Sequence, residues 1–100
     1  WNESWNIARR TFAYTNHTVL PEALEAWSID LFGRLLPRHL QIIEEIDRRL
    51  RGRVEDTFPN DSARVERMAI LANGQVRMAS LAIAGSHSVN GVAALHTQII

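Results

Sequence analysis

The fold of this chain depends most on the stretch PRHLQIIEEIDRRLRGRVEDT, residues 37–57. Its apolar side chains recur at steps of three and four residues, which places them on one stripe of an α-helix, with acid–base pairs on the other face. The stripe consists of Leu40, Ile43, Ile46, Leu50 and Val54, and the charged pairs are Glu44–Arg48, Glu45–Arg49 and Asp47–Arg51. We predict one long helix. A solvated face explains its charges more simply than a partner-binding surface does.

Upstream of this stretch the spacing predicts shorter helices. Residues 1–14 place Trp and Phe side chains at helical intervals, and the polar stretch 15–18 should end that helix in a turn. Pro21 suits the first turn of a second helix, whose apolar face would include Trp27. Ser28 is a plausible N-cap for the next short element.

Downstream, residues 58–61 break the pattern, with Asn60 or Asp61 as the cap of a helix that reaches Leu71. The dipeptide Asn73-Gly74 should close that helix. Residues 76–84 predict a single, nearly buried strand, and a turn separates it from a last helix over residues 89–100. The expected inventory is therefore mainly α, about five helices and one strand. A lone strand needs partners from outside, so residues 1–100 are expected to be a partial domain.

Composition limits what the chain can do. It has 100 residues, 46% hydrophobic and 22% charged, with a net charge of zero and no cysteine. These values fit one small soluble globular unit, and they favour neither a nucleic-acid-binding surface nor a membrane span nor a disulfide framework. All eleven cationic side chains are Arg. Without a lysine the chain has no side-chain amine for a Schiff base with an aldehyde cofactor.

The histidines do not predict a metal site. They stand at positions 17, 39, 87 and 96, with no helical i,i+4 pair among them. Ser86 and His87 are adjacent, but no nucleophile-elbow pattern surrounds the serine.

Two loops could carry a polar ligand. His17 lies in a polar stretch just before a predicted helix N-terminus, and it could meet a hydroxyl-rich ligand or simply be a surface histidine. Residues 85–92 (GSHSVNGV) follow the predicted strand, where ligands gather in α/β folds, although a capped strand-to-helix turn explains them equally well.

Three stretches of the chain resemble the signatures of the α-glucan phosphorylases, in the family's order and at nearly its spacing. They are AYTNHTVLPEALE (residues 13–25), LLPRHLQII (residues 35–43) and IAGSHSVNGVA (residues 83–93). The resemblance implies a piece of the later part of the N-terminal domain of a much longer enzyme. That enzyme has two Rossmann-like domains in the glycosyltransferase arrangement called GT-B.

The resemblance also implies an activity for the intact enzyme. These glycogen, starch and maltodextrin phosphorylases transfer glucose from the non-reducing end of an α-1,4-glucan to inorganic phosphate, giving glucose 1-phosphate with retention. Their pyridoxal phosphate is held by a lysine, here outside the chain, and its phosphate relays a proton to the substrate phosphate. The family includes allosteric enzymes, and we expect the parent to be a cytoplasmic homodimer. Residues 1–100 alone are expected to be inactive.

The resemblance assigns roles to residues of this chain. It implies that His17 supports the transition state at the 6-hydroxyl side of the reacting glucose, and that Val92 packs on the same glucose. Thr18, Glu22 and Ala23 would border the entry of the glucan chain. Three further residues would shape the loops, namely Asn16, His87 and Asn90.

The chain also departs from the animal enzymes of the family. Glu44 stands where they have a tyrosine of a secondary glycogen-storage site, and residues 69–78 form a shorter stretch. We therefore expect neither that storage site nor animal-type regulation. The alternative function is a helical carbohydrate-binding or interaction module, derived from the family but without catalysis.

Overall fold

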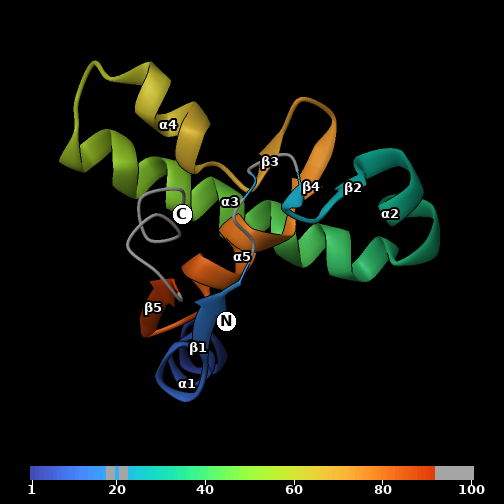
Figure 1. Ribbon diagram of the computed structural model, residues 1–100, viewed down its shortest axis with the longest axis horizontal. Coiled ribbons are helices and arrows are strands. Elements are labelled where there is room, and N and C mark those ends of the chain that lie inside the picture. The colour runs from blue at the N-terminus through green and yellow to red at the C-terminus, as the bar shows by residue number, and fades with distance from the viewer. Residues whose placement is uncertain (18–19, 21–22, 92–100) are drawn as a thin grey trace.

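The computed structural model describes residues 1–17, 20 and 23–91 of the chain. Within these residues the protein is mainly helical (Figure 1). The helices are α1 (Asn2–Thr11), α2 (Ile29–Leu35), α3 (Pro37–Thr57), α4 (Ser62–Met68) and α5 (Met78–Ala84). The strands are β1 (Ala13–Asn16), β2 (Ala26–Ser28), β3 (Leu71–Ala72), β4 (Gln75–Arg77) and β5 (Ser88–Gly91).

The long helix α3 confirms the prediction from residues 37–57 and runs through the middle of the molecule (Figure 1). Its proline occupies the first turn, where a missing N–H costs nothing. The apolar stripe points inward, and Ile43, Ile46 and Val54 are buried. The core gathers around this stripe and consists of Ile43, Ile46, Ile70, Val76 and Ala84.

Two predicted helix caps are confirmed. The Ser28 hydroxyl oxygen accepts a hydrogen bond from the Leu31 backbone N–H at the start of α2, at 3.2 Å. Asp61 caps α4 by accepting from the Arg64 N–H at 3.1 Å. Each side chain satisfies one of the backbone donors that a helix N-terminus leaves unpaired.

The predicted strand over residues 76–84 is wrong for most of its length. Only β4 is extended, and residues 78–84 form helix α5. The segment MASLAIA is short and apolar, so periodicity could not decide between strand and helix, whereas its three alanines favour a helix.

Strand β4 also does not lack partners, contrary to our expectation of a lone strand. It is the middle strand of an antiparallel sheet with the order β2-β4-β3. Val76 of β4 is fully buried and lies opposite Trp27 of β2 and Leu71 of β3. The predicted helix beginning at Pro21 is therefore wrong at its far end, because pairing with β4 draws residues 26–28 into a strand.

The dipeptide Asn73-Gly74 does not end a helix. Helix α4 stops at Met68, and the dipeptide forms the two-residue turn of the β3–β4 hairpin. Both residues have positive φ, 54° and 72°, which is what a type I′ hairpin turn requires and what Asn-Gly favours. Asn-Gly is also common just after the end of a helix. Only the flanking strands β3 and β4 therefore distinguish a hairpin turn from a helix C-terminus.

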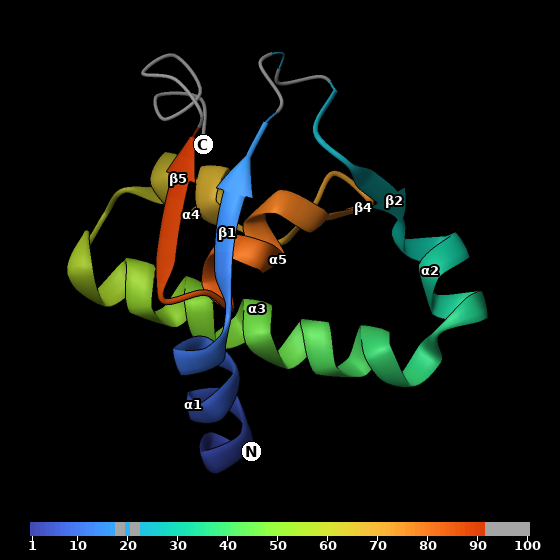
Figure 2. The ribbon, with the colours of Figure 1, turned by 60° about the horizontal axis from the view of Figure 1, so that its bottom comes forward.

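Helix α1 ends earlier than predicted, and residues 13–16 form β1 where the end of that helix and the start of a turn were expected. This strand pairs in parallel with β5, formed by residues 88–91, so the helix predicted over 89–100 is wrong at its start. The rest of that prediction lies outside the described residues. The two strands lie side by side and point the same way (Figure 2). Pairing partners far along the chain decided this element, and local propensity could not reveal them.

The charged face of α3 is only partly solvated. Asp47 is 5% exposed, and its carboxylate accepts from the Ile70 backbone N–H at 2.8 Å and from the Arg51 Nε at 2.8 Å. Arg48 forms its ion pair with Glu45, three residues before it, whereas the predicted partner was Glu44, four residues before it. Ile70 is fully buried, so water cannot reach its backbone N–H. The buried Asp47 carboxylate provides the acceptor that this N–H needs.

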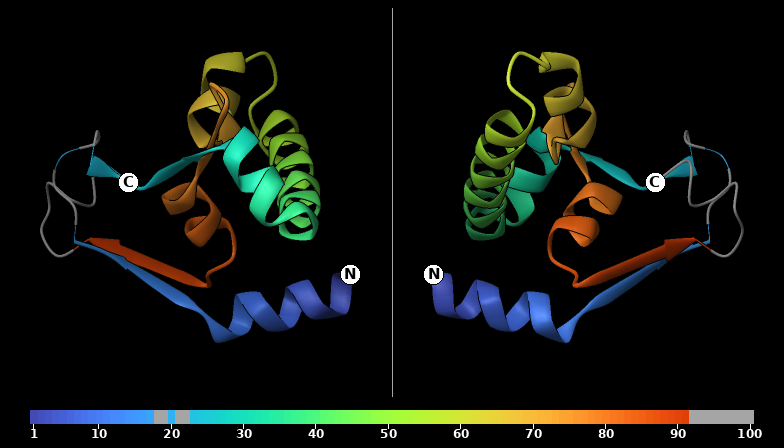
Figure 3. Two further views of the ribbon diagram at one scale, coloured as in Figure 1. Left: turned by 90° about the vertical axis from the view of Figure 1, so that its right-hand side faces the viewer. Right: turned by 90° about the vertical axis from the view of Figure 1, so that its left-hand side faces the viewer.

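The molecule has two layers, seen end-on in Figure 3. One layer holds α2, α3, α4, α5 and the β2-β4-β3 sheet, and the other holds α1 with the β1–β5 pair. Helix α1 has no buried residue, and it contacts the core through the half-buried Trp5. None of the described helices is long and apolar enough to cross a membrane.

Candidate functional site

The β1–β5 pair brings two of the quoted motif segments to one edge of the molecule. Residues 13–16 run alongside residues 88–91 in parallel (Figure 2). Thr15 lies opposite Asn90, and Asn16 lies opposite Gly91. Both strands therefore end at the same edge, as the carboxyl ends of parallel strands do. The Thr15 Oγ1 donates to the Asn90 Oδ1 at 2.8 Å, joining segments 75 residues apart in the sequence.

Asn16 is held in place beneath this edge. It is 2% exposed, and its Nδ2 donates to the Tyr14 hydroxyl oxygen at 2.9 Å. A buried side-chain amide needs such a partner, because leaving it unsatisfied costs free energy. The loop-shaping role of Asn16 stays a prediction.

His17 follows β1 directly and is exposed, as is Ala23. An exposed imidazole at the end of a strand can donate to or accept from a hydroxyl-rich ligand. Three of the residues predicted to bind substrate, Thr18, Glu22 and Val92, lie outside the described residues. Their roles stay predictions.

His87 lies at the other end of the same pair of strands. Its backbone N–H donates to the Phe12 carbonyl at 2.9 Å, just before β1 and β5 begin. Four residue pairs lie between this end and His17, so the two positions are five residue steps apart along the strands, about 16 Å at the usual rise. The structure therefore does not bring His17 and His87 together, and a role for His87 would be to shape the turn that enters β5.

Ser86, beside His87, is not placed as a nucleophile. It is buried, and its hydroxyl donates to the Ala82 carbonyl at 2.6 Å. This bond binds the hydroxyl to the last turn of α5, where carbonyl groups need donors. Gly85 in the same turn lies against Trp5, whose ring would be 3.6 Å from a Cβ added there.

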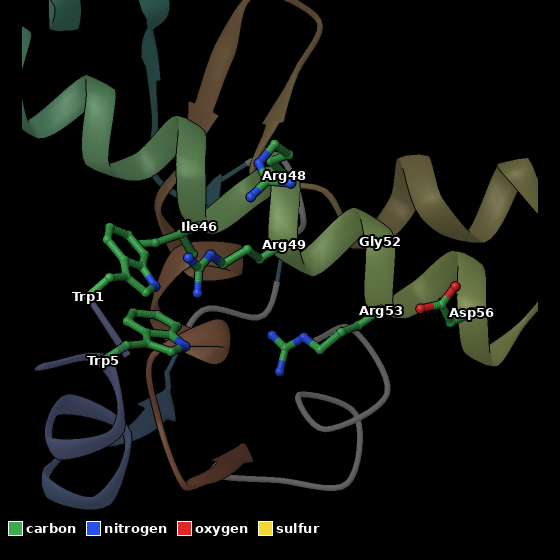
Figure 4. A pocket seen from close by; sticks show the side chains of 8 residues that line it. All are labelled: Trp1, Trp5, Ile46, Arg48, Arg49, Gly52, Arg53 and Asp56. Carbon is green, nitrogen blue, oxygen red and sulfur yellow. The ribbon is translucent and has the colours of Figure 1, made fainter. Parts of the chain in front are cut away.

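Sequence reasoning missed a pocket of about 400 Å³ between α1 and α3 (Figure 4). It is lined by Trp1, Trp5, Ile46, Arg48, Arg49, Gly52, Arg53 and Asp56. The two indole rings stack with centroids 6.3 Å apart, and the Arg49 guanidinium lies 4.9 Å from the Trp1 ring centroid. The four-residue spacing of the tryptophans was visible in the sequence, but nothing local indicated that α1 lies against α3.

Charge in this pocket is dominated by arginine. The Arg48 Nε and Nη2 both bond the Glu45 carboxylate, at 2.7 and 2.6 Å, and the Arg49 Nε approaches it at 3.2 Å. The bond from Arg48, assisted by that from Arg49, lowers the pKa of Glu45 from 4.5 to about 2. The Glu45 carboxylate thus accepts hydrogen bonds from two guanidinium groups. The Arg53 side chain extends toward Trp5 (Figure 4). The lining suits a ligand with acceptor oxygens and an apolar face.

The described residues offer no group of three or more His, Cys, Asp or Glu side chains that could hold a metal ion. The chain has no lysine either, so it cannot supply the amine that binds an aldehyde cofactor as a Schiff base. A pyridoxal cofactor therefore does not fit the residues of this chain as its covalent site.

Comparison with known proteins places the whole chain in one group. Residues 1–100 match the family model described as carbohydrate phosphorylase. The chain is 55% identical to the muscle form of glycogen phosphorylase from Macaca fascicularis, 54% to that from Homo sapiens and 52% to glycogen phosphorylase from Synechocystis. Each match covers 100% of this chain and 12% of the relative, so the chain spans about an eighth of these relatives' length.

Proposed function

Because this chain belongs to the carbohydrate phosphorylase family, we propose that it is part of an α-glucan phosphorylase and supplies one wall of its glucose pocket. The parent would transfer glucose from the non-reducing end of an α-1,4-glucan to inorganic phosphate and release glucose 1-phosphate with retained configuration. The observation that carries this proposal is the parallel pairing of β1 with β5, which brings the segments containing His17 and Asn90 to one edge.

His17 is the proposed catalytic residue. It directly follows β1 and is exposed at the carboxyl edge of the strand pair, where a sugar hydroxyl could reach it. A hydrogen bond from its imidazole or its neighbouring backbone that strengthens as the sugar ring flattens would lower the barrier selectively. Val92 would pack on the same glucose, and Thr18, Glu22 and Ala23 would border the incoming glucan.

The rest of the catalytic apparatus would come from outside these residues. We place the chain in the later part of the N-terminal domain of a two-domain, Rossmann-like GT-B enzyme. In that parent, pyridoxal phosphate would be bound by a lysine of another segment and would supply a proton to the substrate phosphate. The parent is proposed to be a cytoplasmic homodimer, on the strength of the family resemblance alone.

The direct test is product analysis with the full-length parent. Incubation with an α-1,4-glucan and inorganic phosphate should produce the α anomer of glucose 1-phosphate. Phosphorus and proton NMR would identify this product and its anomeric configuration. A β anomer would contradict retention. Glucan binding without any sugar phosphate would favour the second candidate function.

That second candidate is a non-catalytic carbohydrate-binding or interaction module, and the pocket between α1 and α3 favours it. Trp1 and Trp5 offer stacked apolar rings, and Arg48, Arg49 and Arg53 offer donors for acceptor oxygens (Figure 4). The replacement Arg53→Ala would separate the candidates, because Arg53 is exposed and lines this pocket, so a binding module loses glucan affinity with it. A phosphorylase whose sugar site lies at His17 keeps its affinity for the reacting glucose.

A further inference from the structure

We propose that Thr15 and Asn90 form a positioning pair that holds β1, and with it His17, in register with β5. The inference rests on the proposed function, because it concerns the same site. Its starting point is the 2.8 Å hydrogen bond from the Thr15 hydroxyl to the Asn90 side-chain oxygen, which crosses from β1 to β5.

The pair lies on the exposed face of the two strands. Thr15 and Asn90 are exposed, whereas Asn16 next to Thr15 is buried on the opposite face. Side chains alternate between the faces of a strand, so the next position of the same parity after Thr15 is His17. His17 is the residue proposed to contact the reacting glucose.

Strand stability does not explain this pair. An exposed hydrogen bond between two neutral side chains adds little free energy of folding, because water offers the same bonds. Asparagine is also depleted in strands, where a β-branched residue would pair better. A polar pair at this point therefore contributes little to strand stability. It fixes the relative position of the two strands shortly before His17.

The physical effect is on the relative position of two short segments. The pairing of β1 with β5 covers four residue pairs, and each strand has no other strand beside it within the described residues. Such a ladder can slip or twist easily. A side-chain bond close to its carboxyl end restrains the ends of both strands, and small misplacements of a catalytic group are costly in rate.

The test is a double-mutant cycle in the full-length enzyme loaded with its cofactor, assayed in the phosphorolysis direction. The variants are Thr15→Val, Asn90→Ala, the double variant, and Thr15→Ser as the conservative control. We expect each single replacement to lower kcat roughly tenfold, the value of one hydrogen bond, with the glucan KM almost unchanged. The double variant should fall no further, and Thr15→Ser should restore kcat.

Three results would overturn the proposal. The effects of the two single variants could multiply in the double variant, which would mean that the residues act independently. The melting temperature could fall while kcat per folded enzyme stays constant, which would show a structural role only. Thr15→Val could also leave kcat unchanged. In that last case His17→Ala shows whether the proposed function also fails. If His17→Ala lowers kcat, the proposed function stands and only the role of the Thr15–Asn90 pair is lost. If His17→Ala leaves kcat unchanged, the proposed function and the role of the pair are both lost.

Discussion

At the scale of single residues, Asp47 connects α3 to the segment that leads into the hairpin. Its carboxylate accepts from the buried Ile70 N–H and from Arg51, which in turn bonds the Leu71 carbonyl. Asp47→Ala leaves the Ile70 N–H without its acceptor and should lower the free energy of unfolding by about 3 kcal/mol. Denaturant unfolding measures this. Glu44→Ala on the exposed face of the same helix is the matched control, and an equal loss there would contradict the account.

Glu45 makes a pH-dependent contribution at the same scale. The bond from Arg48, with help from Arg49, lowers the pKa of Glu45 from 4.5 to about 2 in the folded chain. A carboxyl group with a depressed folded pKa stabilises the fold above its unfolded pKa, and this stability is lost as the pH falls through the folded pKa. The window therefore runs from about pH 4.5 down to about pH 2.

The matching experiment compares melting temperatures of the wild type and Glu45→Gln across that window. The wild type should be more stable near neutral pH, and the difference should shrink as the pH falls below about 4.5. The sign is the informative part, because a difference that grows on acidification would mean that the carboxylate is not held ionised by its arginines.

At the scale of elements, two glycines should respond in opposite directions to alanine. Gly74 has φ of 72° in the hairpin turn, a conformation that alanine adopts at a cost of roughly 1 kcal/mol. Gly52 lies inside α3, and a Cβ there meets nothing within 4 Å. Gly74→Ala should therefore lower the melting temperature, and Gly52→Ala should raise it through better helix propensity. Stabilisation by Gly74→Ala would show that the turn is not of type I′.

The same contrast explains what the sequence could predict. The bounds of α3 and the caps Ser28 and Asp61 were predictable, because they depend on neighbours within a few residues. Strand β2 was not, because Trp27 is drawn into a sheet by Val76, far along the chain. At the candidate site, the motifs identified His17 and Asn90, but only the structure shows the Thr15–Asn90 bond. The pocket between α1 and α3 depends on how two helices meet, which no local pattern encodes.

At the scale of the whole molecule, the two layers should differ in stability. The first layer contains the core around Ile46 and Val76, whereas β5 is largely exposed and α1 has no buried residue. Parallel strands normally need cover on both faces. In the 100-residue chain alone, amides of β1 and β5 should exchange with deuterium much faster than those of α3. In the full-length parent they should become protected. Equal protection of both layers in the isolated chain would contradict this division.

The central claim, that the edge beyond β1 and β5 is the sugar site, is tested most directly by His17→Ala in the full-length enzyme. Steady-state phosphorolysis should show kcat reduced about a hundredfold, the usual effect of removing one donor aimed at the transition state, with a much smaller change in KM. His39→Ala is the control, since this exposed histidine lies on α3 away from the strand pair, and it should keep kcat close to wild type. A near-normal kcat for His17→Ala, or an equal loss with His39→Ala at unchanged melting temperature, would contradict the claim.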